Sequence, residues 1–387
     1  MSYFQSHNCF MKNYNLSLRE KLHLFDKRYF LLIVSVVLIG VAMLYSVGGG
    51  NFSTWAGKQL MRFFMCAGLC IAISLVNLRF FLKYAYVFYA IGLVLLLAVS
   101  LFGTVGMGAQ RWLNLGLFRL QPSEVMKVVL IIALARYFHS ASLDQIHSTK
   151  QTLIPTFMML VPVGLILTQP DLGTAMMLVL ETVFVFFLAG VQVWKFITVG
   201  VLTLCSLPIV WSCLHDYQQQ RVLTFLNPEA DPLGAGYHIL QSKITLGSGG
   251  LFGKGFLEGT QSRLNFIPEK QTDFIFTVLC EEFGLLGSFI LLVIYASIII
   301  YGFVIAAKSQ NFFGKILASG LTVNFALYVF INMGMVMGLL PVVGVPLPLV
   351  SYGGTAMTTL LIAFGLMENV AINQKMQIGR RGSIDDA

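Results

Sequence analysis

Long apolar runs, separated by short polar stretches, dominate the sequence. Ten can be marked, at residues 29–47, 59–77, 82–102, 124–138, 152–168, 172–190, 194–213, 274–306, 316–338 and 350–372. A helix needs about 20 apolar residues to cross the hydrocarbon core of a bilayer, and most of these runs approach or exceed that length. A transmembrane β-barrel would instead alternate apolar and polar residues. The pattern therefore predicts an all-α polytopic membrane protein with about ten transmembrane helices.

The composition supports this prediction. Charged residues make up 11% of the 387 residues and hydrophobic residues 57%, whereas an ordinary soluble domain has about 25% charged residues. A soluble globular enzyme is excluded, because so little charge could not cover its surface. A disordered chain is excluded as well, because so much apolar surface does not stay unfolded in water.

The distribution of Lys and Arg predicts the orientation. The net charge of +8 is spread over short loops rather than gathered in a basic patch, so it indicates the positive-inside rule and no nucleic-acid partner. With the N-terminus inside, the inner loops hold most of the Lys and Arg. We therefore expect a cytoplasmic N-terminal tail at 1–28, a membrane domain at 29–373 and a cytoplasmic C-terminal tail at 374–387. The first run has no small-residue cleavage site and is expected to remain as a signal anchor.

Four irregular stretches are predicted to meet on the outer face. The longest, residues 214–273, separates the seventh and eighth predicted helices and forms an extracytoplasmic loop. Pro and Gly break the apolar pattern at 167–174 and 339–354, and the segment 108–124 is also irregular. Such backbone is tolerated at membrane depth only where protein or a wet cavity satisfies its polar groups. We expect a cavity there.

Charges inside the apolar pattern are the candidates for chemistry. Glu124 and Lys127 are three residues apart and share one helix face, which fits either a structural ion pair or the wall of a substrate cavity. Glu181 stands alone in its segment and needs a partner. Asp273 opens the eighth segment, where it or Thr272 could cap the helix. The residues alone leave catalysis and transport open.

Other familiar sites are not indicated. The glycine run at 246–259 has Ser248 where a phosphate-binding loop needs glycine, so its glycines are expected to allow tight turns against the bundle. No group of His, Cys, Asp or Glu has the spacing of a zinc site, and there are no ligand pairs for a haem. We therefore expect no organic cofactor.

From about Tyr29 to Asn373 the sequence resembles the SEDS family of shape, elongation, division and sporulation proteins. The motifs that carry the resemblance are RWL…QPSEVMK (111–127), QPDLGTA (169–175), NPEADPLGAGYHILQS (227–242), GSGGLFGKG (247–255), IPEKQTDFIF…EEFG (267–284) and PVVGVPLPLVSYGG (341–354). Two stretches, GTQSRLNFIPEKQTDF (259–274) and PVVGVPLPLVSYGG (341–354), look more like the rod-shape branch of the family than its division branch. The sequence departs from the family at Gln271, where many members have His, and at Gln110 and Thr355.

The resemblance implies a peptidoglycan glycosyltransferase of the bacterial cytoplasmic membrane. Such an enzyme joins lipid II, an undecaprenyl-diphosphate-linked disaccharide-pentapeptide, into glycan strands at the outer face for cell elongation. Its implied partners are a class B penicillin-binding protein, which cross-links the strands, and other membrane proteins of the elongation complex. A divalent cation, Mg²⁺ or Mn²⁺, could accompany the diphosphate, but no metal ligand is assigned.

The family's catalytic aspartate matches Asp273. The residues that we expect to contact substrate are Glu124, Lys127, Arg111, Lys243 and Arg263. The alternatives are a flippase that moves lipid II across the membrane, a polymerase specific for division, and a scaffold for the penicillin-binding protein. A transporter would show broken helices in both halves of the chain, as here, but also an inverted repeat, which is not evident.

Overall fold

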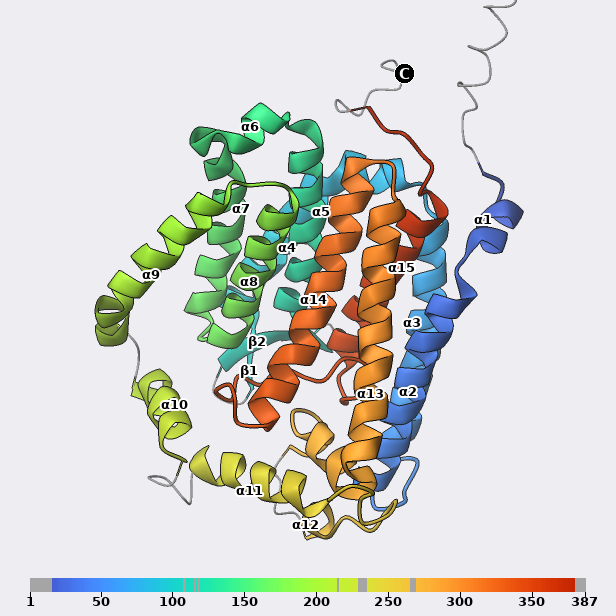
Figure 1. Ribbon diagram of the computed structural model, residues 1–387, viewed down its shortest axis with the longest axis vertical. Helices are drawn as coiled ribbons and strands as arrows, with labels where there is room; N and C mark the ends of the chain where they lie inside the picture. Colours follow the sequence, from blue (N-terminus) through green and yellow to red (C-terminus); the bar gives the residue numbers. More distant parts are fainter. Residues whose placement is uncertain are drawn as a thin grey trace, which may run out of the picture.

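In the computed structural model, long helices stand side by side and carry short helices and strands at their two ends (Figure 1). The structure describes residues 16–106, 109–114, 116, 119–213, 216–228, 235–264 and 269–379. The two predicted tails, and the motifs at 227–242 and 267–284, therefore lie partly outside the described residues.

The elements in chain order are α1 (Leu18–Leu24), α2 (Lys27–Val47), α3 (Ala56–Leu75), α4 (Leu78–Phe102), β1 (Thr104–Gly106), β2 (Ala109–Asn114), β3 (Arg119–Leu120), α5 (Pro122–Ser140), α6 (Leu143–His147), α7 (Thr149–Thr168), α8 (Leu172–Leu188), α9 (Val193–Cys213), α10 (Asp216–Leu226), α11 (Ala235–Ser248), α12 (Thr260–Arg263), α13 (Ile275–Lys308), α14 (Phe312–Val336) and α15 (Gly354–Ile372). Each of the ten predicted segments corresponds to one helix of this series. The predicted all-α membrane architecture is confirmed.

Among the described residues, seven helices are long and apolar enough to cross a membrane, namely α2, α3, α4, α7, α13, α14 and α15. Helices α8 and α9 are apolar but supply shorter stretches. Helix α5 differs from the seven because it carries Glu124, Lys127 and Arg136 within its 19 residues. These three complete the ten predicted segments.

Side chains and proline define where several helices begin. Asp26 accepts hydrogen bonds from the first backbone N–H groups of α2, and Asn77 and Asn311 do the same for α4 and α14. Such N-caps satisfy donors that have no partner inside the helix. Pro122 stands at the start of α5, where its missing N–H costs nothing.

The eighth predicted segment is long because α13 contains a sharp kink. Gly284 has φ 64° and ψ −159°, a backbone conformation that is essentially restricted to glycine. The glycine run docks on this kink: the amides of Leu285 and Leu286 donate to the carbonyls of Gly250 and Leu251, at 3.0 and 3.1 Å. A Cβ at Gly253 would collide with the Glu282 backbone. The expected tight packing of the glycine run against the bundle is confirmed.

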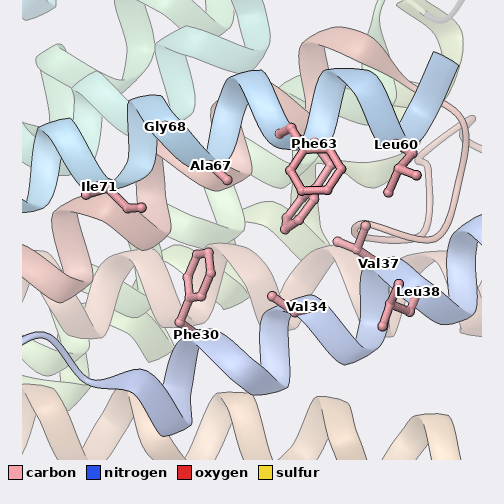
Figure 2. Close-up of a pocket in the computed structure, with 10 residues that line it drawn as sticks. Phe30, Val34, Val37, Leu38, Leu60, Phe63, Ala67, Gly68 and Ile71 are labelled. Carbon is pink, nitrogen blue, oxygen red and sulfur yellow. The ribbon is translucent and has the colours of Figure 1, made fainter. Parts of the chain in front are cut away.

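Helix α14 lies at the centre of the bundle, since 89% of its membrane-length window is buried. It packs against α5, α8, α13 and α15, while α3 packs against α15. By contrast, α2 and α3 leave a groove of about 410 Å³ between them (Figure 2). Its lining is apolar, including Phe30, Val37 and Phe63, so it offers no group for catalysis.

Irregular structure gathers at one end of the bundle. The segment after α4 forms a small antiparallel sheet in the order β1-β2-β3, and α10, α11 and α12 lie at this same end (Figure 1). The predicted long loop is therefore partly helical. Contacts described below join all four predicted irregular stretches, so their convergence on one face is confirmed.

Candidate active site

Asp273 lies in the turn that precedes α13, at the end of the bundle that carries the sheet and the long loop. Asn332 of α14 donates from its side-chain amide to the backbone carbonyls of Asp273 and Val345, at 3.0 and 2.7 Å. A Cβ on Gly344 would lie 3.5 Å from a carboxylate oxygen of Asp273. The N-cap of α13 is Phe274, without a side-chain cap. The capping alternative for Asp273 and Thr272 is therefore wrong, and the Asp273 carboxyl is available for another role.

The broken segment 339–354 supports the backbone on either side of Asp273. The Ser351 hydroxyl donates to the Thr272 carbonyl at 2.5 Å, and the Tyr352 amide donates to the Gln271 carbonyl at 2.8 Å. Helix α3 adds a further contact, since the Gln59 amide donates to the Ser351 carbonyl at 3.0 Å. The position of Asp273 is thus determined by three parts of the chain that lie far apart in sequence.

The electrostatic surroundings of Asp273 favour its neutral form. Burial raises the pKa of its carboxyl from 3.8 to about 6, and the carboxylate of Glu269 adds to the rise. Arg111 acts in the opposite direction. Gln271, where this chain departs from its family, donates to Glu269 at 3.1 Å. A carboxyl with a pKa near 6 can both accept and release a proton near neutral pH.

Arg111 of β2 connects the sheet to the start of α8. Its Nε lies 3.3 Å from Asp171, and its Nη2 donates to the Pro170 carbonyl at 3.3 Å. Asp171 is buried and also caps α8 by accepting from the Thr174 amide and hydroxyl, at 3.2 and 2.8 Å. Asp171 therefore neutralises Arg111 and holds it within electrostatic reach of Asp273.

Glu124 and Lys127 form a buried ion pair on α5, with 2.9 Å between Lys127 Nζ and Glu124 Oε1. Tyr328 of α14 completes the group: Lys127 donates to its hydroxyl, and this hydroxyl donates to the second oxygen of Glu124. Glu181 of α8 lies within electrostatic reach of both charges, yet its two buried oxygens accept no hydrogen bond in the described structure. Asp171 in turn acts on Tyr328. The polar groups thus form a series that leads from Asp273 into the bundle.

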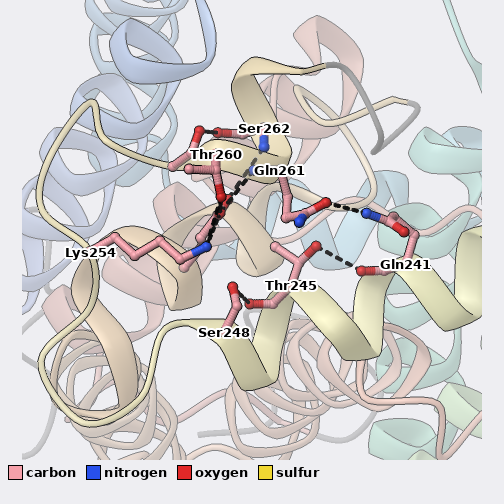
Figure 3. Close-up of polar contacts among 9 residues, drawn as sticks. Gln241, Thr245, Ser248, Lys254, Thr260, Gln261 and Ser262 are labelled. Carbon is pink, nitrogen blue, oxygen red and sulfur yellow. Dashed lines mark hydrogen bonds and ion pairs between the residues drawn. The ribbon is translucent and has the colours of Figure 1, made fainter.

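The long loop is anchored by Glu281, a fully buried carboxylate of α13. Figure 3 shows three of its partners, Lys254, Gln261 and Ser262. It accepts from the Lys254 ammonium at 2.8 Å and from the backbone amides of Gln261 and Ser262 at 2.9 and 3.3 Å. The Ser262 carbonyl then accepts from Lys270 at 2.7 Å. Short helix α12 therefore connects α13 with the segment that carries Asp273.

The remaining two predicted substrate contacts lie in this loop region. Arg263 is exposed on α12 and acts electrostatically on Glu282, the neighbour of Glu281. Lys243 is exposed on α11, where its side chain lies against Gly338 at the end of α14. Of the four predicted cations, Arg111 is the one whose charge lowers the pKa of Asp273.

Three residues of the site were not singled out from the sequence. The sequence could have indicated Asp171, because it is a charged residue between two apolar segments. It indicated Asn332 less clearly, as a side-chain amide within an apolar helix. Tyr328 had none, since it is one of 14 tyrosines in an aromatic-rich chain. Its role follows from the packing of α14 against α5.

Comparison with known proteins identifies the family. Residues 26–376 match the family model of the FtsW, RodA and SpoVE proteins, described as cell cycle proteins. The chain is 44% identical over 359 residues to the peptidoglycan glycosyltransferase MrdB of Escherichia coli K12, covering 92% of this chain and 96% of that protein. It is 33% identical to the stage V sporulation protein E of Bacillus subtilis, covering 88% and 96% of the two chains.

Solved structures agree with this assignment. A chain from a structure described as "Structural coordination of polymerization and crosslinking by a peptidoglycan synthase complex" superposes with a TM-score of 0.76 at 28% identity, covering 91% of this chain and 99% of that one. The crystal structure of the rod shape determining protein RodA of Thermus thermophilus gives a TM-score of 0.69 at 25% identity, covering 91% and 98%. The chain therefore belongs to the family of membrane-embedded cell cycle proteins that comprises FtsW, RodA and SpoVE.

Proposed function

We propose that this peptidoglycan glycosyltransferase polymerises lipid II into β-1,4 glycan strands and that Asp273 is its general base. One observation carries the proposal: the partly buried Asp273 carboxyl, whose pKa burial raises to about 6, lies within electrostatic reach of Arg111, at the end of a buried polar series. Chain elongation needs one such base, because a sugar hydroxyl must lose its proton as it attacks.

The reaction then follows from simple chemistry. The 4-hydroxyl oxygen of one lipid II molecule attacks the anomeric carbon of the diphosphate-linked sugar at the end of a growing glycan chain. The attack comes from the face opposite the diphosphate. The new C–O bond forms as the bond to the diphosphate breaks, which converts an α-linked donor into a β-linked product. The hydroxyl proton passes to the Asp273 carboxylate. Diphosphate leaves as an anion, so cations can stabilise it without a general acid.

Arg111 and Lys127 are the best supported contacts for the diphosphate, followed by Lys243 and Arg263. Arg111 acts on Asp273, and the Glu124–Lys127 pair belongs to the same polar series. The described residues hold no group of three His, Cys, Asp or Glu side chains that could bind a metal. Asp273 and Glu269 could still supply carboxylates to Mg²⁺ or Mn²⁺ carried on the diphosphate, because Mg²⁺ is often held by one or two carboxylates plus phosphate oxygens.

The biological setting is proposed on the similarities. The multi-pass chain resembles MrdB of Escherichia coli more strongly than it resembles the FtsW proteins, at 44% against 33 to 34% identity, which favours elongation over division. The structural neighbour from a synthase complex supports a class B penicillin-binding protein as partner. We further propose that Asp273 faces the outside of the cytoplasmic membrane and that both termini are cytoplasmic, as the positive-inside rule predicts.

Asp273→Asn should abolish polymerisation, by about 10²- to 10⁴-fold in rate, because Asn cannot accept a proton. At pH values above about 6 the variant should be more stable than the wild type. The fold raises the pKa of Asp273 and so disfavours its ionised side chain, which Asn replaces with a neutral one. Gel analysis of lipid II products and thermal unfolding in detergent measure the two effects. Normal polymer would remove Asp273 from the mechanism, and rescue by excess Mg²⁺ or Mn²⁺ would assign it to a metal instead.

The acidic limb of the pH dependence of kcat/KM should reflect the ionisation of Asp273. Activity requires the ionised base, so kcat/KM should fall as the pH drops through about 6. Glu269→Gln removes a carboxylate that raises the pKa and should move this limb to lower pH, whereas Arg111→Gln should move it to higher pH. Shifts in the same direction for both variants would contradict the assignment, whatever the change in absolute rate.

A double-mutant cycle separates the two roles of the Glu124–Lys127 pair. Glu124→Gln or Lys127→Met alone should destabilise the protein by about 3–5 kcal/mol, because each leaves a buried charge unpaired. The double variant should recover most of this stability but no polymerising activity. A double variant that is both stable and active would leave the pair a purely structural role.

The orientation is tested with a reporter fused after Lys254, in the long loop. Alkaline phosphatase, which folds only outside the cytoplasm, should be active there, and a cytoplasmic reporter should be inactive. A fusion after Lys308, at the opposite end of α13, provides the matched control and should give the reverse pattern. Cytoplasmic activity after Lys254 would invert the proposed orientation.

A further inference from the structure

One face of α3 is docked on the start of α15 and on the segment before it. Gln59, Arg62 and Cys66 are spaced i, i+3 and i+7 and so share this face. Gln59 donates to the Ser351 carbonyl at 3.0 Å, and the Cys66 thiol lies 3.3 Å from the Thr358 hydroxyl. Arg62 lies between these two contacts. It is therefore close to the backbone that supports Asp273.

The guanidinium of Arg62 is held in place by an aromatic ring. Its central carbon lies 4.7 Å from the centroid of the Tyr352 ring, and a Cβ on Gly354 would lie 3.5 Å from that carbon. Trp55 packs edge-on against Tyr352, with 4.7 Å between the ring centroids. A guanidinium stacked on a ring has lost much of its conformational freedom. Its N–H groups lie in the guanidinium plane and can still donate to a ligand.

Arg62 differs from Arg111, Lys127 and Lys254 because its charge is not neutralised by a carboxylate. Arg111 pairs with Asp171, Lys127 with Glu124 and Lys254 with Glu281. In the described part of the chain, the Arg62 N–H groups have no carboxylate or carbonyl partner, and the side chain is partly exposed. One turn away, the Oε1 of Gln59 is buried and accepts no hydrogen bond.

We propose that Arg62 binds a phosphate group at this end of the bundle, and that this phosphate belongs to the lipid-linked diphosphate of the substrate. A planar guanidinium with free donors matches phosphate oxygens in a bidentate manner. The inference rests on the proposed function, because it takes its ligand from there, and it adds a phosphate contact on α3 to those on β2 and α5.

The test measures binding of undecaprenyl diphosphate to the purified full-length protein in phosphatidylcholine nanodiscs. This probe carries no sugar and cannot be polymerised, so its affinity is independent of the role of Asp273. Arg62→Gln should weaken binding about 10- to 100-fold, the usual range for a charged hydrogen-bonded contact. Arg62→Lys should fall in between, because it keeps the charge but not the fork. Arg79→Gln removes an exposed cation at the opposite end of the bundle and should bind as the wild type does.

Parallel measurements keep each outcome interpretable. Thermal unfolding identifies any variant that loses binding because it no longer folds. If Arg62→Gln is such a variant, the affinity of Arg62→Lys tests the proposal instead. Equal affinity of wild type and Arg62→Gln overturns the inference alone, whereas no binding by wild type also overturns the lipid-linked substrate. Repeating the titration in discs that contain phosphatidylglycerol tests the other possible source of the phosphate, the headgroup of a bulk membrane lipid. An effect of Arg62→Gln confined to those discs would assign Arg62 to bulk lipid and overturn the substrate assignment.

Discussion

The buried contact among Lys127, Glu124 and Tyr328 is the interaction on which the architecture of the site depends. A lone charge inside a bilayer is costly, so charged side chains there turn inward and pair. Here the pair lies within α5 and is completed by α14, the most buried helix of the bundle. Lipid-facing positions can then remain apolar, while a polar series extends through Asp171 and Arg111 to Asp273. The cost of burying charge thus selects one arrangement of α5, α8 and α14.

The backbone around Asp273 illustrates how an irregular segment becomes rigid in a membrane protein. The turn before α13 is supported by Asn332, by the Ser351 hydroxyl and by the Tyr352 amide. On the far side, Glu281 and the kink at Gly284 hold the glycine run and α12. Because these contacts satisfy the backbone polar groups, the segment can break helical geometry at this depth. A carboxyl held in such a place is partly desolvated, which is the main cause of its raised pKa.

The charges near the site divide into two classes. Arg111, Lys127 and Lys254 are each neutralised by a carboxylate, and these pairs connect separate elements of the fold. Such cations can help to stabilise an anion only together with the carboxylate that accompanies them. Arg62 is oriented by an aromatic ring instead, which leaves its charge and its donors uncompensated. The cations therefore differ in what holds them, a carboxylate for Arg111, Lys127 and Lys254 and an aromatic ring for Arg62.

The sequence by itself determined the membrane class and the ten apolar helical segments, and it made Asp273, Glu124 and Lys127 the candidates for chemistry. Apolar length is a local property that requires no knowledge of neighbours, and a charge in an apolar run is conspicuous wherever it occurs. Only the tertiary structure decided which groups meet: that Tyr328 bridges Glu124 and Lys127, that Asp171 neutralises Arg111, and that Asp273 is not a helix cap. It also separated Lys243 and Arg263, exposed on the loop, from Arg111, whose charge acts on Asp273. These outcomes depend on helix packing between residues far apart in the chain, which no local pattern of residues encodes.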